Sequence, residues 1–156
     1  MEPFYYKSPV GALEIICENN KLISLKLVEK AGLSPKETDF EKNIKSQLEE
    51  FFAGKRRTFD ISINPKGTDF QKKVWKELLK IPYGKTKSYS GIAAALKSPS
   101  AQRAVGSACN KNPIMIVIPC HRVISKNGNL GGFAYGNSVK LKLLGMENSY
   151  STSKSK

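Results

Sequence analysis

The segment Ile118–Val123, with the sequence Ile-Pro-Cys-His-Arg-Val, places Cys120 beside His121, the only histidine among 156 residues. A thiol attacks as its thiolate, and a free cysteine with a pKa of about 8.5 is little ionised at neutral pH. His121 could take the proton directly or through one water, and a third polar group would then orient the imidazole. The pair is a candidate nucleophile and base, with a purely structural cysteine and histidine as the alternative interpretation.

The element before the cysteine must hold it in place. The apolar run over residues 114–118 predicts a buried strand that Pro119 ends, so that Cys120 opens the following turn. A nucleophile at a strand end would be rigidly held.

Charge is divided unevenly along the chain. Residues 1–60 carry ten Lys/Arg and ten Asp/Glu, whereas residues 61–156 carry sixteen against three, so the net charge of +13 lies entirely in the second part. An excess this one-sided predicts an acidic polymer as partner, with nucleic acid first.

Cysteine and histidine usage argues against a metal or disulfide protein. The three cysteines are odd in number and lack a C-x-x-C spacing, and one histidine cannot complete a usual zinc set, so we expect reduced thiols, no metal and no cofactor. The N-terminus lacks the features of a signal peptide, and no apolar run approaches the ~20 residues of a membrane span. We expect a soluble cytoplasmic protein without membrane contact, associated with the nucleoid, or nuclear in a eukaryote.

The first part of the chain resembles a scaffold. Strand-like runs over residues 4–6, 13–17 and 22–27 predict antiparallel hairpins, and the alternation over 59–63 predicts a further strand. The capping-box pattern Thr38-x-x-Glu41 opens an amphipathic helix that Gly54 ends. Residues 1–63 are therefore predicted to form an α/β scaffold domain.

The second domain is predicted to be mainly helical. Residues 64–67 have the composition of a linker, and a second capping box starts a helix with Trp75 on its core-facing stripe. Two short helices over about 89–96 and 101–110, with Ser88 and Ser100 as N-caps, suggest a helix-turn-helix. This domain spans residues 68–148, and we expect the Ser/Lys tail, 149–156, to be disordered.

The second of these short helices consists mostly of small residues, whereas a helix that reads the major groove carries long polar side chains. Its small face therefore suggests docking that depends on DNA shape, in the minor groove.

Taken together, the motifs resemble the O6-alkylguanine-DNA alkyltransferases, closely over about residues 65–148. The first sixty residues match the ribonuclease-H-like N-terminal domain of that family in their order of elements, and the second domain would be winged-helix-like. The matching motifs are Pro82-Tyr83-Gly84-Lys85, Tyr89, Arg103-Ala104-Val105-Gly106, Asn112-Pro113, Ile118–Val123 and Leu143-Leu144-x-x-Glu147.

The resemblance implies a two-domain α+β DNA repair protein that acts once. Cys120 would take the alkyl group from O6-alkylguanine, or also from O4-alkylthymine, and keep it. His121 would deprotonate the thiol through a water, Glu147 would orient the imidazole, and Asn112 would brace the turn.

The same resemblance implies that a monomer binds double-stranded DNA through the minor groove and flips the damaged nucleotide. Tyr89 would rotate the nucleotide outward, and Arg103 would enter the stack in its place. The further DNA contacts expected on this basis are Ala101, Gln102, Ala104, Ser107, Lys111 and Arg122.

The pocket for the flipped base is expected to include Val123, Phe133, Ala134 and Tyr135. Many members of the family have Tyr at the position of Phe133 and Gly at that of Tyr135. Our hypothesis is that Tyr135 narrows the pocket mouth and disfavours bulky adducts.

Two alternatives remain at this point. A non-enzymatic sensor of alkylated DNA or helix-turn-helix regulator would bind DNA without chemistry, but such relatives lack the reactive cysteine. A cysteine hydrolase of acyl groups would need an oxyanion hole and would leave the basic domain unexplained.

Overall fold

The computed structural model describes residues 2–154, which divide into two compact units between Lys66 and Gly67. This division falls within the segment 64–67 predicted to be the linker. No helix in this described range is long and apolar enough to cross a bilayer.

The first unit contains a three-stranded antiparallel sheet in the order β1-β2-β3, which confirms the predicted hairpins. Its strands are β1 (Phe4–Ser8), β2 (Gly11–Glu18) and β3 (Lys21–Val28). Asn19 and Asn20 connect β2 to β3 with φ of 53° and 56°. A two-residue turn of this kind needs positive φ at both positions, which asparagine tolerates better than most residues.

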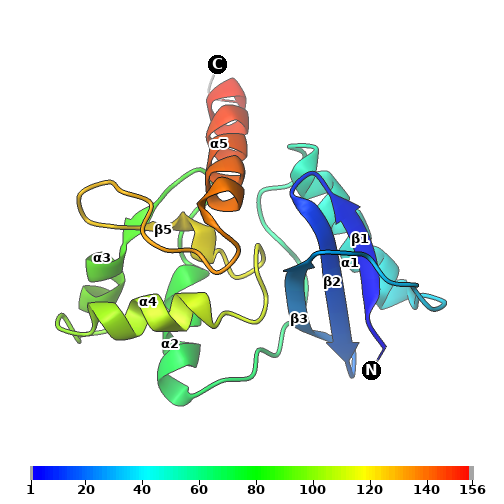
Figure 1. Cartoon of the computed structure of the whole chain (residues 1–156), viewed down its shortest axis with the longest axis horizontal. Coiled ribbons are helices and arrows are strands. Elements are labelled where there is room, and N and C mark those ends of the chain that lie inside the picture. Colours follow the sequence, from blue (N-terminus) through cyan, green and yellow to red (C-terminus); the bar gives the residue numbers. More distant parts are fainter. Residues whose placement is uncertain (1, 155–156) are drawn as a thin grey trace. The chain divides into compact units, whose positions relative to one another are not determined.

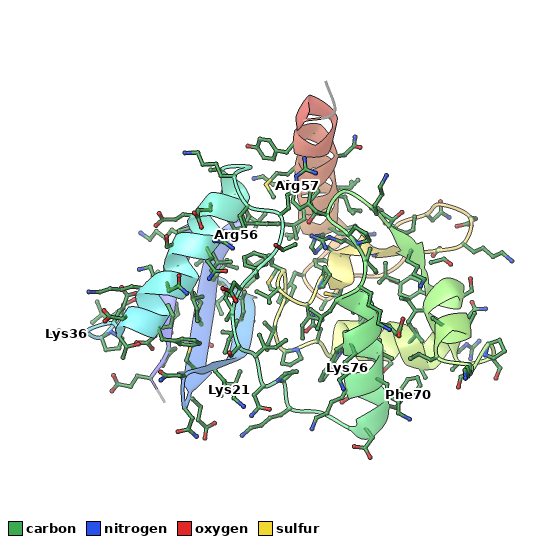
Figure 2. The ribbon with its side chains drawn as sticks, turned by 180° about the vertical axis from the view of Figure 1, so that it is seen from behind. Lys21, Lys36, Arg56, Arg57, Phe70 and Lys76 are labelled. Carbon is green, nitrogen blue, oxygen red and sulfur yellow. The ribbon has the colours of Figure 1, made fainter. Side chains whose placement is uncertain are left out.

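Helix α1 (Asp39–Phe52) covers one face of this sheet (Figures 1 and 2). It begins with the predicted capping box, in which Thr38 Oγ1 accepts from Glu41 N at 3.2 Å and Glu41 Oε1 accepts from Thr38 N at 2.9 Å. The core between helix and sheet is formed by Phe4, Leu13, Ile15, Leu22, Leu25, Ile44, Leu48 and Phe51, all 0% exposed.

The strand predicted over residues 59–63 is wrong. Only Ile63 pairs with the sheet, in a single parallel bridge to Leu22. The backbone of Asp60 is satisfied by a side chain instead, because Gln47 Oε1 accepts from its N–H at 2.9 Å and Gln47 Nε2 donates to its carbonyl at 3.0 Å. The buried side chain of Gln47 on α1 therefore makes the hydrogen bonds that a neighbouring strand would otherwise make to Asp60.

The second unit is built around α2 (Asp69–Leu78), α3 (Tyr89–Ala95) and α4 (Gln102–Asn110). Both α2 and α3 pack against α4 (Figure 1). Trp75 is 2% exposed and its indole N–H donates to the carbonyl of Ala108 at 2.9 Å. The predicted core role of this tryptophan is confirmed.

The connection between α3 and α4 forms the turn of the helix-turn-helix. Ser88 caps α3 as predicted, since its Oγ accepts from the backbone N–H three residues later at 2.9 Å. Lys97, with φ of 60°, lets the chain reverse. Ser100 does not cap α4, because the chain enters this helix through a tight turn in which Ala101 N donates to Ser98 O at 2.9 Å, and Ala101 occupies the N-cap position.

The remaining elements complete the second unit. Strands β4 (Lys87–Ser88) and β5 (Val123–Ile124) pair in parallel, and a single 3-10 turn, η1 (Cys120–Arg122), precedes β5. Helix α5 (Asn137–Lys154) runs through most of the expected disordered tail, 149–156, because no glycine or proline interrupts it there. The last two residues lie outside the described range.

The apolar run over residues 114–118 is a buried turn, so the predicted strand is wrong. Ile116 has a φ of 72°, and Ile118 N donates to Ile114 O at 3.1 Å. The carboxamide of Asn112 spans the turn, donating to Ile118 O at 2.8 Å and accepting from Ile114 N at 2.9 Å. Hydrogen bonds within the turn and from Asn112 thus satisfy backbone groups that would otherwise pair with a neighbouring strand.

Candidate active site and DNA-binding groove

Cys120 is the first residue of η1, directly after this braced turn, and is 5% exposed. Burial raises the pKa of its thiol, whereas a hydrogen bond from Asn112 and the positive charge of Lys140 act in the opposite direction. The thiol is therefore protonated at rest, and a base must act before it can attack.

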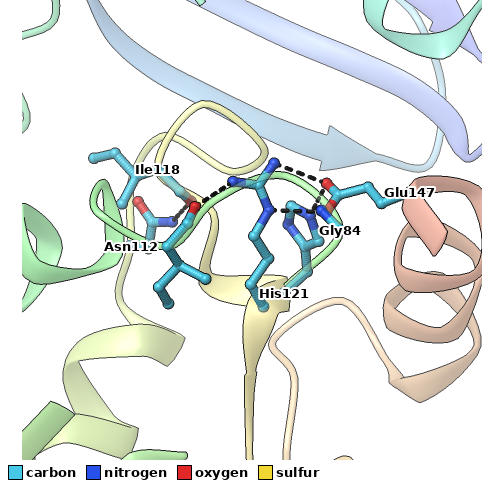
Figure 3. A network of polar contacts seen from close by, with 7 residues as sticks. Gly84, Asn112, Ile118, His121 and Glu147 are labelled. Atoms are coloured by element: carbon cyan, nitrogen blue, oxygen red, sulfur yellow. Dashed lines mark hydrogen bonds and ion pairs between the residues drawn. The ribbon is translucent and has the colours of Figure 1, made fainter. Parts of the chain in front are cut away.

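His121 and Glu147, predicted to be the base and its orienting partner, form a hydrogen-bonded pair (Figure 3). The distance from His121 Nε2 to Glu147 Oε2 is 2.6 Å, with the two side chains 0% and 1% exposed. Glu147 also accepts from Arg122, at 2.8 Å from Nε and 3.0 Å from Nη2, and from Gly84 N at 3.2 Å. The Glu147 carboxylate on α5 thus links the turn before α3 to the Cys-His-Arg segment through hydrogen bonds.

The protonation states follow from this geometry. Burial acts to raise the pKa of Glu147, but the hydrogen bonds and charges of His121 and Arg122 outweigh it and lower the pKa to about 2. Burial lowers the pKa of His121, although Glu147 acts against it. A neutral imidazole beside a carboxylate must donate through Nε2, which leaves Nδ1 as an acceptor. This Nδ1 is buried and has no hydrogen-bond partner within the described part of the chain.

Two predictions are wrong because the residues concerned are buried. Arg122, predicted to bind DNA, is 6% exposed, and its guanidinium is occupied by Glu147 and by the carbonyl of Ile81, 2.8 Å from Nη1. Val123, predicted to line the base pocket, is 0% exposed within β5. Arginine is hydrophilic, so its presence in the sequence did not indicate that Arg122 would be buried in an ion pair with the Glu147 carboxylate.

The expected DNA-contacting residues of α4 do share one solvent-facing side, because Val105, Ala108 and Cys109 occupy the buried side. Ala101, which precedes the helix, is partly exposed. The exposed members are Gln102, Arg103, Ala104, Ser107 and Lys111.

A groove of about 280 Å³ runs beside this helix. We call it the α4 groove. One wall is formed by α4 and the other by the chain that follows β5, with Tyr89 between them. Its lining residues are Tyr89, Gln102, Arg103, Gly106, Asn110, Ser125, Gly131 and Gly132.

Tyr89 is fixed against the second wall of the α4 groove. Its hydroxyl donates to Gly132 O at 3.2 Å, and a Cβ placed on Gly131 would lie 2.8 Å from its ring. Gly131 has a φ of 70°, so both backbone conformation and space require glycine there. Burial, followed by the negative charges of ionised Cys109 and Cys120, raises the pKa of Tyr89 to about 12.

Lys140 on α5 is a buried cation that the sequence did not single out. Its ammonium donates to Leu130 O at 2.5 Å and lies 5.7 Å and 5.8 Å from the ring centroids of Tyr89 and Phe133. Nothing in the sequence distinguishes this lysine from the fifteen other basic residues of the segment 61–156. Gly131 and Gly132, which directly follow Leu130, were the available signal for the groove wall.

The predicted base-pocket loop is placed just beyond this wall. The rings of Phe133 and Tyr135 meet edge to face at 5.8 Å and 70°, and Ala134 between them is exposed. In residues 2–154, no group of three or more His, Cys, Asp or Glu could hold a metal ion.

Comparison with known families matches both units. Residues 69–149 match the DNA-binding domain of 6-O-methylguanine DNA methyltransferase, and residues 4–65 match its ribonuclease-like domain.

Individual relatives match along most of the chain. A methylated-DNA--protein-cysteine methyltransferase of Methanosarcina acetivorans is 41% identical over 150 residues, covering 92% of this chain and 96% of the relative. The constitutive Bacillus subtilis protein of that name is 43% identical, covering 87% of each chain. The crystal structure of Mycobacterium tuberculosis OGT in complex with DNA is similar, with a TM-score of 0.89, 40% identity, and coverage of 96% of this chain and 94% of that one. The chain therefore belongs to the 6-O-methylguanine DNA methyltransferase family, whose two domains it carries in order.

Proposed function

We propose that Cys120 takes the alkyl group from O6-alkylguanine in double-stranded DNA and retains it. Family membership makes the protein a DNA repair methyltransferase that reverses damage directly. The observation that supports the residue assignment is the buried His121–Glu147 pair, which leaves Nδ1 of His121 without a hydrogen-bond partner among the described residues, on the residue that follows Cys120 in sequence.

The chemistry proceeds in balanced steps. Cys120 Sγ loses its proton to His121 Nδ1 through one water, and Glu147 stabilises the imidazolium that forms. The thiolate attacks the alkyl carbon, the S–C bond forms, and the C–O6 bond breaks. The electron pair stays with guanine, which then takes up a proton. No step restores the thiol, so each molecule acts once.

Keeping the thiol protonated at rest serves this chemistry. Burial raises the pKa of Cys120, so the nucleophile is inert until the relay acts. Asn112 opposes this shift and braces the turn that carries the thiol. Asn112 is therefore a positioning residue that also eases ionisation.

We infer that DNA approaches α4 through its minor groove. The exposed helix face combines Arg103 with small residues, which permits close approach to a sugar-phosphate backbone. The target nucleotide must leave the stack, because a buried thiol cannot reach it there. Tyr89 would push it outward and Arg103 would fill the gap. The protein acts as a monomer in the compartment that holds DNA.

Intact mass measurement tests the proposal. The protein and a Cys120→Ala variant are incubated with a duplex carrying one O6-methylguanine. A gain of one methyl group by the wild type alone supports transfer to Cys120. Tight lesion binding without a mass gain favours an alkylated-DNA sensor, and a gain that persists in the variant places the acceptor elsewhere.

A further inference from the structure

Cys109 is a second buried thiol in the second unit, and the proposed repair chemistry does not use it. It lies in the last turn of α4, on the buried side of that helix, and is 6% exposed, compared with 5% for Cys120. Both side chains are free thiols. Two thiols in one unit can form a disulfide if the fold brings their sulfur atoms together.

Asn112 joins the two backbone segments that carry these thiols. Its N–H donates to Cys109 O at 3.3 Å, and its Nδ2 donates to Ile118 O at 2.8 Å (Figure 3). The same Ile118 carbonyl accepts from Cys120 N at 2.8 Å. Consecutive hydrogen bonds through one asparagine therefore connect Cys109 to Cys120, although the two residues are eleven positions apart in sequence.

Both thiols also act on the same two neighbouring groups, Tyr89 and Lys140. The Lys140 ammonium donates to the Tyr89 hydroxyl at 3.5 Å. Ionised Cys120 and Cys109 oppose the burial that lowers the pKa of Lys140, and they add to the burial that raises the pKa of Tyr89. Electrostatic effects fall with distance, so both sulfur atoms lie close to the Tyr89–Lys140 pair.

The two thiols affect each other as well. Burial raises the pKa of Cys109 to about 12, and the negative charge of ionised Cys120 acts in the same direction, whereas Lys140 opposes both. Cys109 therefore stays protonated while Cys120 is the thiol that the relay ionises. Helix ends adjust more easily than helix interiors, so the last turn of α4 can accommodate the geometry of a disulfide.

We propose that Cys109 is a resolving thiol for Cys120, and that hydrogen peroxide converts the pair into a reversible intramolecular disulfide. The inference rests on the proposed function, because the His121 relay that ionises Cys120 for alkyl transfer also ionises it for attack on peroxide. The disulfide blocks alkyl transfer while it lasts, and its reduction restores an active protein.

The oxidation balances in two steps. The Cys120 thiolate attacks one peroxide oxygen, the S–O bond forms, the O–O bond breaks, and the departing hydroxide takes the proton held by His121 to give water. Cys120 is then a sulfenic acid, oxidised by two electrons. Cys109 Sγ attacks Cys120 Sγ, the S–S bond forms, and the S–O bond breaks, releasing a second water with the Cys109 proton. A dithiol reductant reverses the disulfide by exchange.

Cys109 thereby protects the nucleophile from permanent loss. A sulfenic acid without a partner thiol is oxidised further to sulfinic acid, which a dithiol does not reduce. With Cys109 present, the reaction stops at the disulfide.

Peroxide treatment followed by mass analysis tests the inference. The full-length wild type, Cys109→Ala, Cys109→Ser and Cys17→Ala are oxidised with hydrogen peroxide, their remaining thiols are blocked, and intact masses and linked peptides are measured. Cys17 is the matched control, because it belongs to the first unit and burial likewise raises its pKa to about 12. Methyl transfer to each protein from an O6-methylguanine duplex is measured before oxidation, after it, and after dithiothreitol.

The wild type and Cys17→Ala should lose two hydrogen atoms and yield a peptide pair joined through Cys109 and Cys120. Their methyl transfer should fall about tenfold or more and return with dithiothreitol. Both Cys109 variants should transfer like the wild type before oxidation. After oxidation they should carry two added oxygen atoms on Cys120 and should not recover with dithiothreitol.

Oxidised wild type without the Cys109–Cys120 link would overturn the inference, as would full recovery of either Cys109 variant with dithiothreitol. The reduced wild type separates this result from the proposed function. A wild type that forms the link but takes up no methyl group when reduced would count against the proposed function alone. Methyl transfer without the link would count against the disulfide alone, and the absence of both would overturn both.

Discussion

Replacing Glu147 with glutamine should both destabilise the protein and abolish its chemistry. The carboxylate accepts from Arg122, His121 and Gly84, and its side chain is 1% exposed. Glutamine keeps the shape but loses the charge, so the Arg122 guanidinium remains buried and uncompensated. Breaking a buried ion pair in this way costs about 3 to 5 kcal/mol. In this chain, that is a large share of a typical free energy of unfolding of about 5 to 15 kcal/mol.

The same change affects the tautomer of His121. The amide NH₂ of glutamine, turned toward Nε2, would favour the imidazole with its proton on Nδ1, which can no longer accept from Cys120. The wrong tautomer in comparable relays costs about 10⁴-fold in rate. We therefore expect methyl transfer by folded Glu147→Gln to fall by about that factor.

The assay is single-turnover transfer from an O6-methylguanine duplex, at a temperature where circular dichroism shows the variant folded. Urea unfolding of the same samples gives the stability change. Glu49→Gln, at an exposed position on α1, is the control and should stay within about 0.5 kcal/mol of the wild type. A folded Glu147→Gln that transfers within tenfold of the wild-type rate would refute the relay.

Four further outcomes are expected. Asn112→Ala leaves the buried N–H of Ile114 without its partner and removes one of the two donors to the Ile118 carbonyl, so thermal unfolding should show a loss of about 2 kcal/mol, and an unchanged melting temperature would contradict the bracing role of Asn112. Burial lowers the pKa of His121 from 6.5, so the unfolded chain takes up the extra proton as pH falls, and urea unfolding should show less stability at about pH 5 than at pH 7, a difference that His121→Asn removes. Gly131→Ala should push Tyr89 from its place and slow transfer, a prediction that equal single-turnover rates would exclude. Tyr135→Gly should raise the rate of benzyl relative to methyl transfer, and an unchanged ratio would dismiss the narrowing hypothesis.

Local signals predicted the elements well where neighbours in sequence decide the structure. Both capping boxes form as expected, because Thr38 and Thr68 each meet their partner three residues later. The strand predicted over residues 114–118 fails because an apolar run indicates burial without specifying hydrogen-bond partners. Asn112, two residues before the run, supplies those partners and closes a turn instead.

The sequence by itself determined the family and predicted Cys120 as the nucleophile with His121 as its base, because the two residues are adjacent and the motif around them is distinctive. It also located the positive charge in the second domain. Tertiary structure decided which charged groups are buried: Arg122 pairs with Glu147 rather than DNA, and the ammonium of Lys140 lies close to the rings of Tyr89 and Phe133. The Arg122–Glu147 and Lys140–Tyr89 contacts join residues that are 25 and 51 positions apart. Their formation depends on how helices pack around desolvated charges, and no local pattern of residues encodes that.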